Sequence, residues 1–412
     1  MSQSLVTCPF CGLGCDDLPS DSGRVDAKGC AKAVAGFARV AASRQSHTVA
    51  GAPASLDAAV AAAAAILRNA SAPLFHGLTA DLHGIRALIA LADRTGGIVD
   101  HRFSPALLAN AAVARASGWV AATFAEIANR AEFVLLVACD PDRNFPRFSE
   151  RLLRNRTPLY RAAPPAIAYL GPPELAPARE KAPLQAHVEP GGPLASLGAL
   201  AAAVGGRAVR VPASPSLTEI AERLKSARYG TIVWEAGVWE AGQLAPDEAE
   251  LAIETIALIL RRLNLATRCV GLPLGGAGNA LGAQQAALWQ AGWPLRVGFG
   301  DGTPRHDPWR YDGNRMLAAG EADALIWVAA LVPEPPPATD IPVIALVADD
   351  VALAAPPAVT IRVGIPALDQ AGAIVRSDTI IALALQAAAP SDRPSVAAVA
   401  RAISEHLGAR SC

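Results

Sequence analysis

Short runs of apolar residues alternate along the chain with longer segments whose apolar positions recur at helical spacing. The runs that predict buried strands cover residues 72–78, 97–100, 131–140, 230–236, 322–330, 341–349 and 359–364. The helical patterns cover 55–70, 216–227, 246–264 and 279–291, and a terminal amphipathic helix is predicted within 394–412. Strands that alternate with amphipathic helices are typical of parallel sheets with helices on both faces. The pattern therefore predicts an α/β fold.

Helix starts and connections refine this pattern. Ser55 and Ser216 each precede an apolar periodic segment, and Glu219 stands three residues after Ser216, as in a capping box. Proline and glycine gather in 161–180 and in 332–342, which predicts two surface connections.

Composition narrows the class of protein. The 412 residues suffice for two or three domains, and a net charge of −1 argues against a general nucleic-acid binder. No apolar run reaches the ~20 residues that a membrane span needs, and the first residues lack the pattern of a signal peptide. Four of the seven cysteines crowd at one end, which favours metal ligation in a reducing compartment. We therefore expect a soluble, cytoplasmic protein with neither nucleic acid nor membrane as a partner.

The crowded cysteines are Cys8, Cys11, Cys15 and Cys30, with the spacing C-x2-C-x3-C-x14-C. Thiolates are soft ligands that suit an iron–sulfur cluster or a zinc ion. Three ligands in one tight loop can hold one side of a cuboidal cluster, and a distant fourth can complete it. The alternative is a set of reduced cysteines left from a lost site. Cys139 and Cys269 are isolated, and we expect buried neutral thiols there.

A second feature is the arginine-rich segment 140–161. If 147–156 is helical, Arg147, Arg151 and Arg154 share one face, and Arg143 lies just before it. Guanidinium groups bind carboxylates and phosphates bidentately, so this face could hold a polyanion. The alternative is a solvated helix face.

A glycine-rich loop opens the helical pattern near Asn279. It lacks the dinucleotide-binding fingerprint, because Leu281 stands where the third glycine should be and Gly282 comes one position late. The loop is either a generic ligand cradle or a point of tight packing. Neither a P-loop nor a hydrolytic motif occurs in the sequence.

Four stretches together resemble the B subunit of formylmethanofuran dehydrogenase, in the expected order and over most of the chain. They are "CPFCGLGCDD" with "GCAKA", "FAEIANRAEFVLLVACDPDRNFPRF", "LPLGGAGNALGAQQAALWQAGWPLRVGFGDGTPRHDP" and "DQAGAIVRSDTI". The resemblance implies a molybdopterin-oxidoreductase-like fold, in which the cysteine motif binds a [4Fe–4S] cluster and two interleaved Rossmann-like domains hold a tungsten or molybdenum bis-pterin. Loops after the strands, such as the one at Asp140 and Pro141, would hold the pyrophosphate arms of the cofactor. The domains expected are a cysteine-motif domain at 1–50, a discontinuous α/β domain at 51–105 and 267–412, and an inserted α/β domain at 106–266.

The sequence lacks the residue with which that family binds its metal. The dehydrogenase carries a metal-binding Cys or selenocysteine before the strand at 131–140, but no cysteine occurs here between Cys30 and Cys139. Leu and Ala fill the region as "PALLANAAVARA". We therefore expect no molybdopterin or tungstopterin cofactor and no catalytic residue in this chain.

This departure is what the resemblance implies for the methylotroph version of the assembly, the formyltransferase/hydrolase complex. There a formyltransferase subunit moves a formyl group from tetrahydromethanopterin to methylofuran, and a zinc amidohydrolase subunit releases formate. A further C-type subunit completes the expected partners. The chain would be a non-catalytic scaffold without activity of its own, with Arg143, Arg147, Arg151 and Arg154 contacting the polyglutamate tail of the bound methylofuran.

Two alternatives stay open. The chain could be the catalytic subunit of a tungsten or molybdenum formylmethanofuran dehydrogenase, since all four N-terminal cysteines are retained. A free-standing binding module is the more distant alternative.

Overall fold

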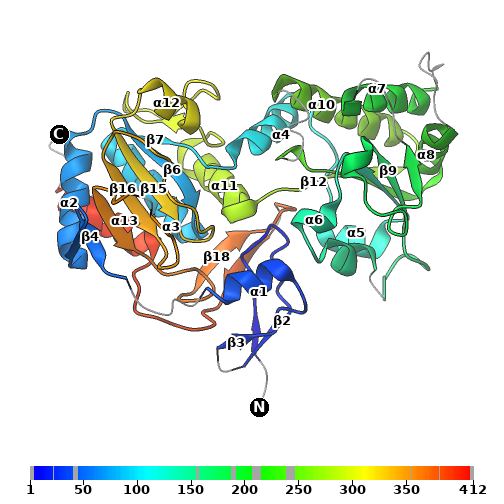
Figure 1. Cartoon of the computed structure of the whole chain (residues 1–412). Coiled ribbons are helices and arrows are strands. Elements are labelled where there is room, and N and C mark those ends of the chain that lie inside the picture. Colours follow the sequence, from blue (N-terminus) through cyan, green and yellow to red (C-terminus); the bar gives the residue numbers. More distant parts are fainter. Residues whose placement is uncertain are drawn as a thin grey trace. The chain divides into compact units, whose positions relative to one another are not determined.

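The computed structural model forms two compact units, shown in Figure 1. Unit 1 combines 1–104 with 276–412, and unit 2 is the continuous segment 105–275. The structure describes residues 4–21, 23–39, 45–154, 157–186, 192–206, 215–237, 246–353, 355–379 and 381–408.

Unit 1 is built on a nine-stranded sheet with a parallel centre. Its strand order is β14-β13-β7-β6-β15-β16-β17-β4-β5, and the five strands from β7 to β17 are parallel. The two outer strands on each side join the sheet through antiparallel pairing. In sheet order the strands are Arg305–His306, Val297–Gly298, Ile98–Val99, Pro73–Thr79, Ala324–Ala329, Val343–Val347, Val359–Arg362, His47–Val49 and Ala52–Ala54.

Amphipathic helices cover this sheet. The helix α13 packs against α2 and α3, and α11 packs against α3. Ser55 caps α2 as predicted, because its hydroxyl accepts a hydrogen bond from the Ala58 amide at 3.1 Å. In the described residues, the helices of the unit include α1 (Ala31–Phe37), α2 (Leu56–Asn69), α3 (Leu82–Thr95), the short 3-10 helix η3 (Ala277–Asn279), α11 (Ala280–Ala291), α12 (Gly313–Ala319) and α13 (Val396–His406).

Two small antiparallel sheets complete unit 1. The N-terminal cysteine segment includes the sheet β1-β2-β3, formed by Ser4–Val6, Leu18–Asp21 and Arg24–Val25. The second is the pair β18 (Gly372–Val375) and β19 (Ala382–Leu385). The two segments touch, since the Thr7 amide donates to Gln386 Oε1 at 3.2 Å. A separate cysteine-motif domain at 1–50 stays a prediction.

Unit 2 has a five-stranded, fully parallel sheet. The strand order is β10-β9-β8-β11-β12, formed by Leu184–Ala186, Ala166–Leu170, Phe133–Val137, Tyr229–Trp234 and Arg268–Pro273. Because β12 pairs with β11, the unit extends past residue 266, where the sequence placed the end of the inserted domain. The α/β class predicted from the pattern is confirmed.

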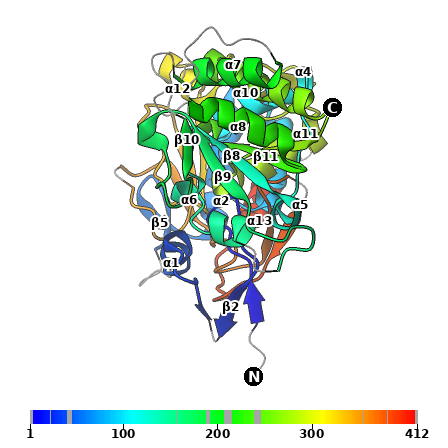
Figure 2. The same cartoon turned by 90° about the vertical axis from the view of Figure 1, so that its right-hand side faces the viewer.

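Figure 2 shows α7, α8 and α10 gathered beside this sheet. Helix α8 begins at Pro215, so Ser216 lies inside the helix and the predicted cap at Ser216 is wrong. Among the residues that the structure describes, unit 2 includes the helices α4 (Ser104–Ala116), α5 (Phe124–Arg130), α6 (Pro141–Asn144), the π-helix η1 (Ser149–Leu153), the short 3-10 helix η2 (Pro173–Leu175), α7 (Gly192–Val204), α8 (Pro215–Ser226) and α10 (Pro246–Leu263).

The predicted surface connection at 161–180 is wrong in part. It contains β9, whose residues Ala168, Tyr169 and Leu170 are fully buried between β8 and β10. Across the described ranges, no helix combines the length and apolar character needed to cross a bilayer.

Candidate functional site

The four N-terminal cysteines are all buried in unit 1. The Cys8 amide donates to the Cys15 carbonyl at 2.8 Å and closes the loop that carries three of them. Burial raises the pKa of the Cys8 thiol far above its ordinary value, and Cys11, Cys15 and Cys30 raise it further through like charge. The sulfurs of Cys11, Cys15 and Cys30 therefore lie close enough to Cys8 to act on its charge, and a thiolate at Cys8 forms only if a positive group compensates it.

The geometry of these thiols differs from that of a single-ion site. In the part of the chain that the structure describes, no three His, Cys, Asp or Glu side chains are grouped so that they could hold a metal ion. A zinc ion needs each sulfur about 2.3 Å from one point. The donor set is thus chemically suited to a soft metal centre, without the convergence that one zinc ion requires.

The glycine-rich loop lies where the strand order of unit 1 reverses, at the carboxyl ends of β6 and β15. Asn279 adopts the left-handed conformation, with φ 63°, and begins α11. The side-chain Nδ2 of Asn279 donates to the Ala80 carbonyl at 3.1 Å, and its side-chain Oδ1 accepts from the Val375 backbone amide at 2.9 Å. Such reversal points are the usual ligand-binding crevices of α/β sheets.

Three motifs that are distant in sequence meet at this point. The Ser377 amide donates to the Gly12 carbonyl at 2.8 Å, which joins the cysteine loop to the segment after β18. A Cβ at Gly276 would stand 3.6 Å from Gly12 Cα, and one at Gly278 only 2.7 Å from the Thr79 side chain. Protein atoms therefore surround these glycines, so close packing accounts for them.

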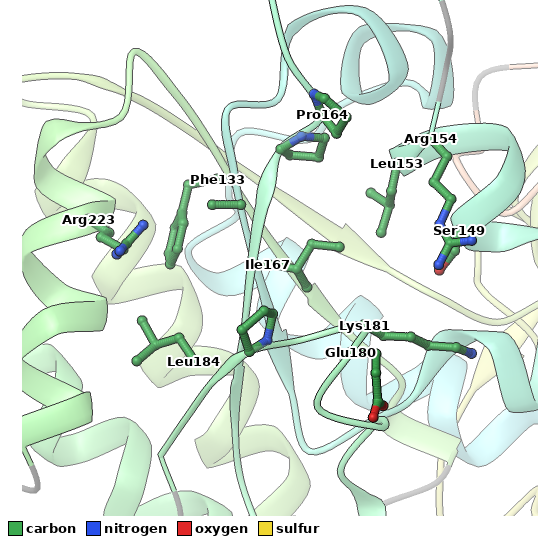
Figure 3. Close-up of a pocket in the computed structure, with 13 residues that line it drawn as sticks. Phe133, Ser149, Leu153, Arg154, Pro164, Ile167, Glu180, Lys181, Leu184 and Arg223 are labelled. Atoms are coloured by element: carbon green, nitrogen blue, oxygen red, sulfur yellow. The ribbon is translucent and has the colours of Figure 1, made fainter.

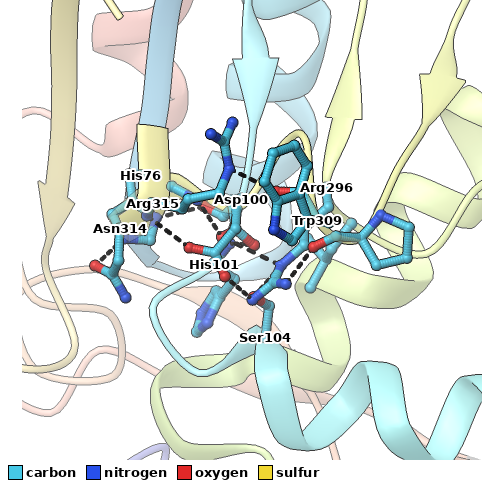
Figure 4. Close-up of polar contacts among 12 residues, drawn as sticks. His76, Asp100, His101, Ser104, Arg296, Trp309, Asn314 and Arg315 are labelled. Carbon is cyan, nitrogen blue, oxygen red and sulfur yellow. Dashed lines mark hydrogen bonds and ion pairs between the residues drawn. The ribbon is translucent and has the colours of Figure 1, made fainter. Parts of the chain in front are cut away.

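A buried polar network follows β7 on the same sheet (Figure 4). Asp100 and His101 come directly after the strand, and both are fully buried. The Asp100 carboxylate accepts hydrogen bonds from the His101 amide at 2.8 Å and the Gly313 amide at 2.9 Å. The Arg296 guanidinium lies 3.6 Å from it.

Arg296 is the cation of this network. It pairs with Asp312 at 2.6 Å and donates to the Ser104 hydroxyl at 3.3 Å and to the Pro308 carbonyl. Burial raises the pKa of the Asp100 carboxyl, and the charges of His76 and Arg296 oppose that rise.

The nearby imidazole of His101 is neutral. Burial lowers the pKa of His101 to about 3, so the ring carries no charge at neutral pH. The network is a set of mutually satisfied groups, which favours a structural role.

Sequence reasoning missed this network. The signal in the sequence was the acidic residue at the end of the strand pattern 97–100, followed at once by a histidine.

The arginine segment lies in unit 2 and differs from the predicted α-helix. Where the sequence predicted a helix at 147–156, the structure has the π-helix η1 over Ser149–Leu153, in which the Arg154 amide donates to the Ser149 carbonyl five residues before it. The α-helical spacing that placed Arg154 on the same face as Arg147 and Arg151 therefore does not apply. Arg156 lies outside the described residues.

The four arginines have different surroundings. Arg147 is 4% exposed and makes a bidentate pair with Glu150 at 2.6 and 2.9 Å. Arg143 is half-exposed and donates to the Glu174 carbonyl at 3.2 Å. Arg154 is exposed and Arg151 is half-buried. The structure thus leaves Arg143 and Arg154 as the accessible cations, and carrier contact by the set stays a prediction.

The segment "PALLANAAVARA" forms most of α4. Leu107, Leu108, Ala109 and Val113 are buried, and the last two belong to the core of unit 2. Where the dehydrogenase resemblance implies a metal-binding thiol, this chain has apolar side chains in close packing.

Cys139 follows β8 at the reversal point of the second sheet. Its thiol is 1% exposed and donates to the Val233 carbonyl at 3.8 Å, and burial raises its pKa well above the usual value. Cys269 is also buried, and burial raises its pKa to about 12. Both are neutral thiols, as the sequence predicted. Beside Cys139, Asp140 caps the short helix α6, and Asn144 bonds to Glu235 at 2.8 Å.

Comparison with known proteins tests the resemblance. The chain is 32% identical, over 365 residues, to the B subunit of the formyltransferase/hydrolase complex Fhc of Methylorubrum extorquens, with 84% of this chain and 92% of that protein covered. It is 26% identical to the B subunit of tungsten-containing formylmethanofuran dehydrogenase 2 of Methanocaldococcus jannaschii, over 79% of this chain and 78% of the other. No protein-family model matches the chain.

A solved structure agrees with these relatives. It is the crystal structure of the formyltransferase/hydrolase complex (FhcABCD) from Methylorubrum extorquens in complex with methylofuran. One of its chains superposes with a TM-score of 0.75 and 31% identity, over 88% of this chain and 98% of that one. The predicted resemblance is confirmed, and the chain belongs to the family of B subunits of the formyltransferase/hydrolase complex, whose relatives include the B subunit of formylmethanofuran dehydrogenase.

Proposed function

We propose that this protein is the B subunit of a formyltransferase/hydrolase complex and has no catalytic activity of its own. The observation that carries the proposal is the match to the Fhc B subunit over 92% of its length, together with the structural match to a chain of the FhcABCD complex. In the complex, formyl-tetrahydromethanopterin would be converted to formate through the methylofuran carrier. The partners would be the formyltransferase, the zinc amidohydrolase and a C-type subunit.

The packing of α4 supports a non-catalytic role. A redox subunit of the dehydrogenase type needs a thiolate or selenolate on its metal, and α4 offers the buried side chains of Leu107, Leu108 and Ala109 instead. These groups have no lone pair to give to a metal.

The fold would be the molybdopterin-oxidoreductase type, now serving as a scaffold. The interleaved order supports this, because the chain leaves unit 1 after residue 104 and returns at residue 276. At the reversal point of unit 1, the space beside Gly276 and Gly278 is filled by Gly12 and Thr79. That packing favours a glycine loop that joins protein segments and leaves no cradle for pterin phosphates.

For the N-terminal thiols we propose a [4Fe–4S] cluster held by Cys8, Cys11, Cys15 and Cys30. All four cysteines are buried, the charges of Cys11, Cys15 and Cys30 act on Cys8, and a cluster of several irons accepts ligands that stand farther apart than those of a single ion. Zinc stays the second candidate for the same donors, and it would require the sulfurs to converge more closely than they do in the structure. The role of the proposed cluster would be structural, because the cluster would join the loop at 8–15 to the start of α1.

The arginine segment would contact the polyglutamate tail of the carrier. Arg143 is half-exposed and Arg154 is exposed, so their guanidiniums can reach carboxylates in solvent. Arg147 is already paired with Glu150 and would contribute by fixing η1.

A second candidate is the catalytic subunit of a tungsten or molybdenum dehydrogenase. Two observations favour it: the 26% identity to the dehydrogenase subunit and the retention of four buried cysteines.

Elemental analysis of the purified native complex separates the two functions. Tungsten, molybdenum, iron and zinc are measured per copy of this chain, and the co-purifying subunits are identified by mass spectrometry. The proposal expects neither tungsten nor molybdenum, about four irons per chain, and a formyltransferase together with an amidohydrolase. One equivalent of tungsten or molybdenum would establish the dehydrogenase instead.

A further inference from the structure

Unit 2 contains a pocket of about 410 Å³, which shares only Arg154 with the carrier contact proposed above (Figure 3). Phe133, Ile167 and Leu184 line it, and they stand at the amino ends of the adjacent parallel strands β8, β9 and β10. The pocket therefore lies at the opposite end of the sheet from Cys139 and Asp140. Since α/β sheets bind their usual cofactors at the carboxyl ends, this is a separate site.

The floor of the pocket is apolar and its sides are cationic. Leu153 and three prolines join Phe133, Ile167 and Leu184 in lining it. Figure 3 places Arg223 on one side of Phe133 and Ile167, and Arg154 with Lys181 on the other. A volume of this size suits a small organic molecule.

Arg154 is the cation available to a ligand. Lys181 pairs with Asp142 at 2.8 Å, and Arg223 pairs with Glu219 at 2.8 Å. The Arg154 guanidinium has neither an ion pair nor a side-chain hydrogen bond with any residue that the structure describes. The acidic lining residue, Glu180, points away from Arg154 in Figure 3.

We propose that this pocket binds a small organic anion, with its carboxylate on Arg154 and an apolar body over Phe133, Ile167 and Leu184. A guanidinium holds a carboxylate through two parallel hydrogen bonds. The apolar floor adds binding free energy in proportion to the apolar area that the ligand buries. A polyglutamate tail has the charge without the apolar body, so the site goes beyond the carrier contact proposed above.

Isothermal titration calorimetry of the full-length protein with 2-naphthoate tests both halves of the ligand. Acetate supplies the charge alone, and 2-naphthylmethanol supplies the apolar body alone. The inference expects both to bind at least about tenfold more weakly than 2-naphthoate, a loss of roughly 1.4 kcal/mol or more each. Equal binding of acetate or of the alcohol would overturn it, and so would undetectable binding of 2-naphthoate.

Charge reversal at Arg154 tests whether the ligand binds in this pocket. Arg154→Glu should reduce 2-naphthoate binding at least about tenfold and make 2-naphthylmethylamine the better ligand. Arg115→Glu is the matched control, because Arg115 is an exposed arginine of the same unit outside the pocket. An equal loss in both variants would overturn the assignment. So would a γ-linked oligoglutamate that binds as tightly as 2-naphthoate, and that result would leave the carrier proposal standing.

Discussion

Replacing Arg296 by Met is expected to destabilise unit 1 strongly. The guanidinium of Arg296 lies 3.6 Å from the fully buried carboxylate of Asp100, and the Arg296 side chain is only 11% exposed. Methionine keeps much of the volume and removes the charge. Asp100 would then keep its hydrogen bonds to the amides of His101 and Gly313 without a nearby guanidinium.

The expected size follows from the burial of the pair. Removing one partner of a buried ion pair costs about 3–5 kcal/mol, because it leaves an uncompensated buried charge. For a domain of about 150–250 residues, 1 kcal/mol corresponds to a shift of roughly 2–4 °C in melting temperature. The variant should therefore melt about 6–20 °C below the parent at neutral pH.

Differential scanning calorimetry of the full chain measures this shift. Arg305→Met is the matched control, because Arg305 pairs with Asp301 in the same unit while both side chains are more than 60% exposed. An exposed pair contributes about 0–1 kcal/mol, so the control should melt within about 4 °C of the parent. Equal melting of the two variants would refute the argument from burial.

The pH dependence gives a second check. Burial already raises the pKa of Asp100, and loss of Arg296 removes a charge that lowers it, so the folded-state pKa rises further. Between the unfolded pKa, about 3.9, and this raised value, the folded state binds more protons than the unfolded state. Stability then falls as pH rises through that window. The deficit of Arg296→Met should therefore shrink toward pH 4, and adding Asp100→Asn should abolish that pH dependence.

Two further predictions concern the cysteine loop and the carrier. Cys11→Ser should lower the iron content of the complex and the melting temperature of unit 1 while leaving formyl transfer intact, and a variant that melts like the parent would rule out a structural cluster. Reversing Arg143 and Arg154 together to Glu should weaken retention of methylofuran, with a smaller effect at high salt because exposed charges are screened. Retention is measured by mass spectrometry of the purified complex, and unchanged retention relative to Arg115→Glu would contradict tail binding.

The sequence predicted the α/β class because most central strands are short apolar runs between amphipathic helices. It missed β9 because "AIAYL" stands among prolines, which usually indicate a connection. Burial between β8 and β10 overrides that local signal, and only the assembled sheet supplies it.

The site was predictable where the residues are neighbours in sequence. The cysteine loop and the start of α11 at Asn279 follow from local patterns. The π-helix η1 was missed, because the spacing of the arginines predicts a shared face without fixing which carbonyl each backbone amide bonds to. The pairing of Asp100 with Arg296 depends on two loops brought together by the sheet, so no local pattern contains it.

The interleaved order of the units has a consequence for synthesis. Strand β6 ends at Thr79, and its parallel neighbour β15 begins at Ala324, so the ribosome must add roughly 250 residues between them. At about 5–20 residues per second of synthesis, the edge of β6 that pairs with β15 stays without that partner strand for some 12–50 s. The continuous unit 2 can fold in that interval. Chaperone protection of the N-terminal third of the nascent chain would then matter more than protection of the middle third.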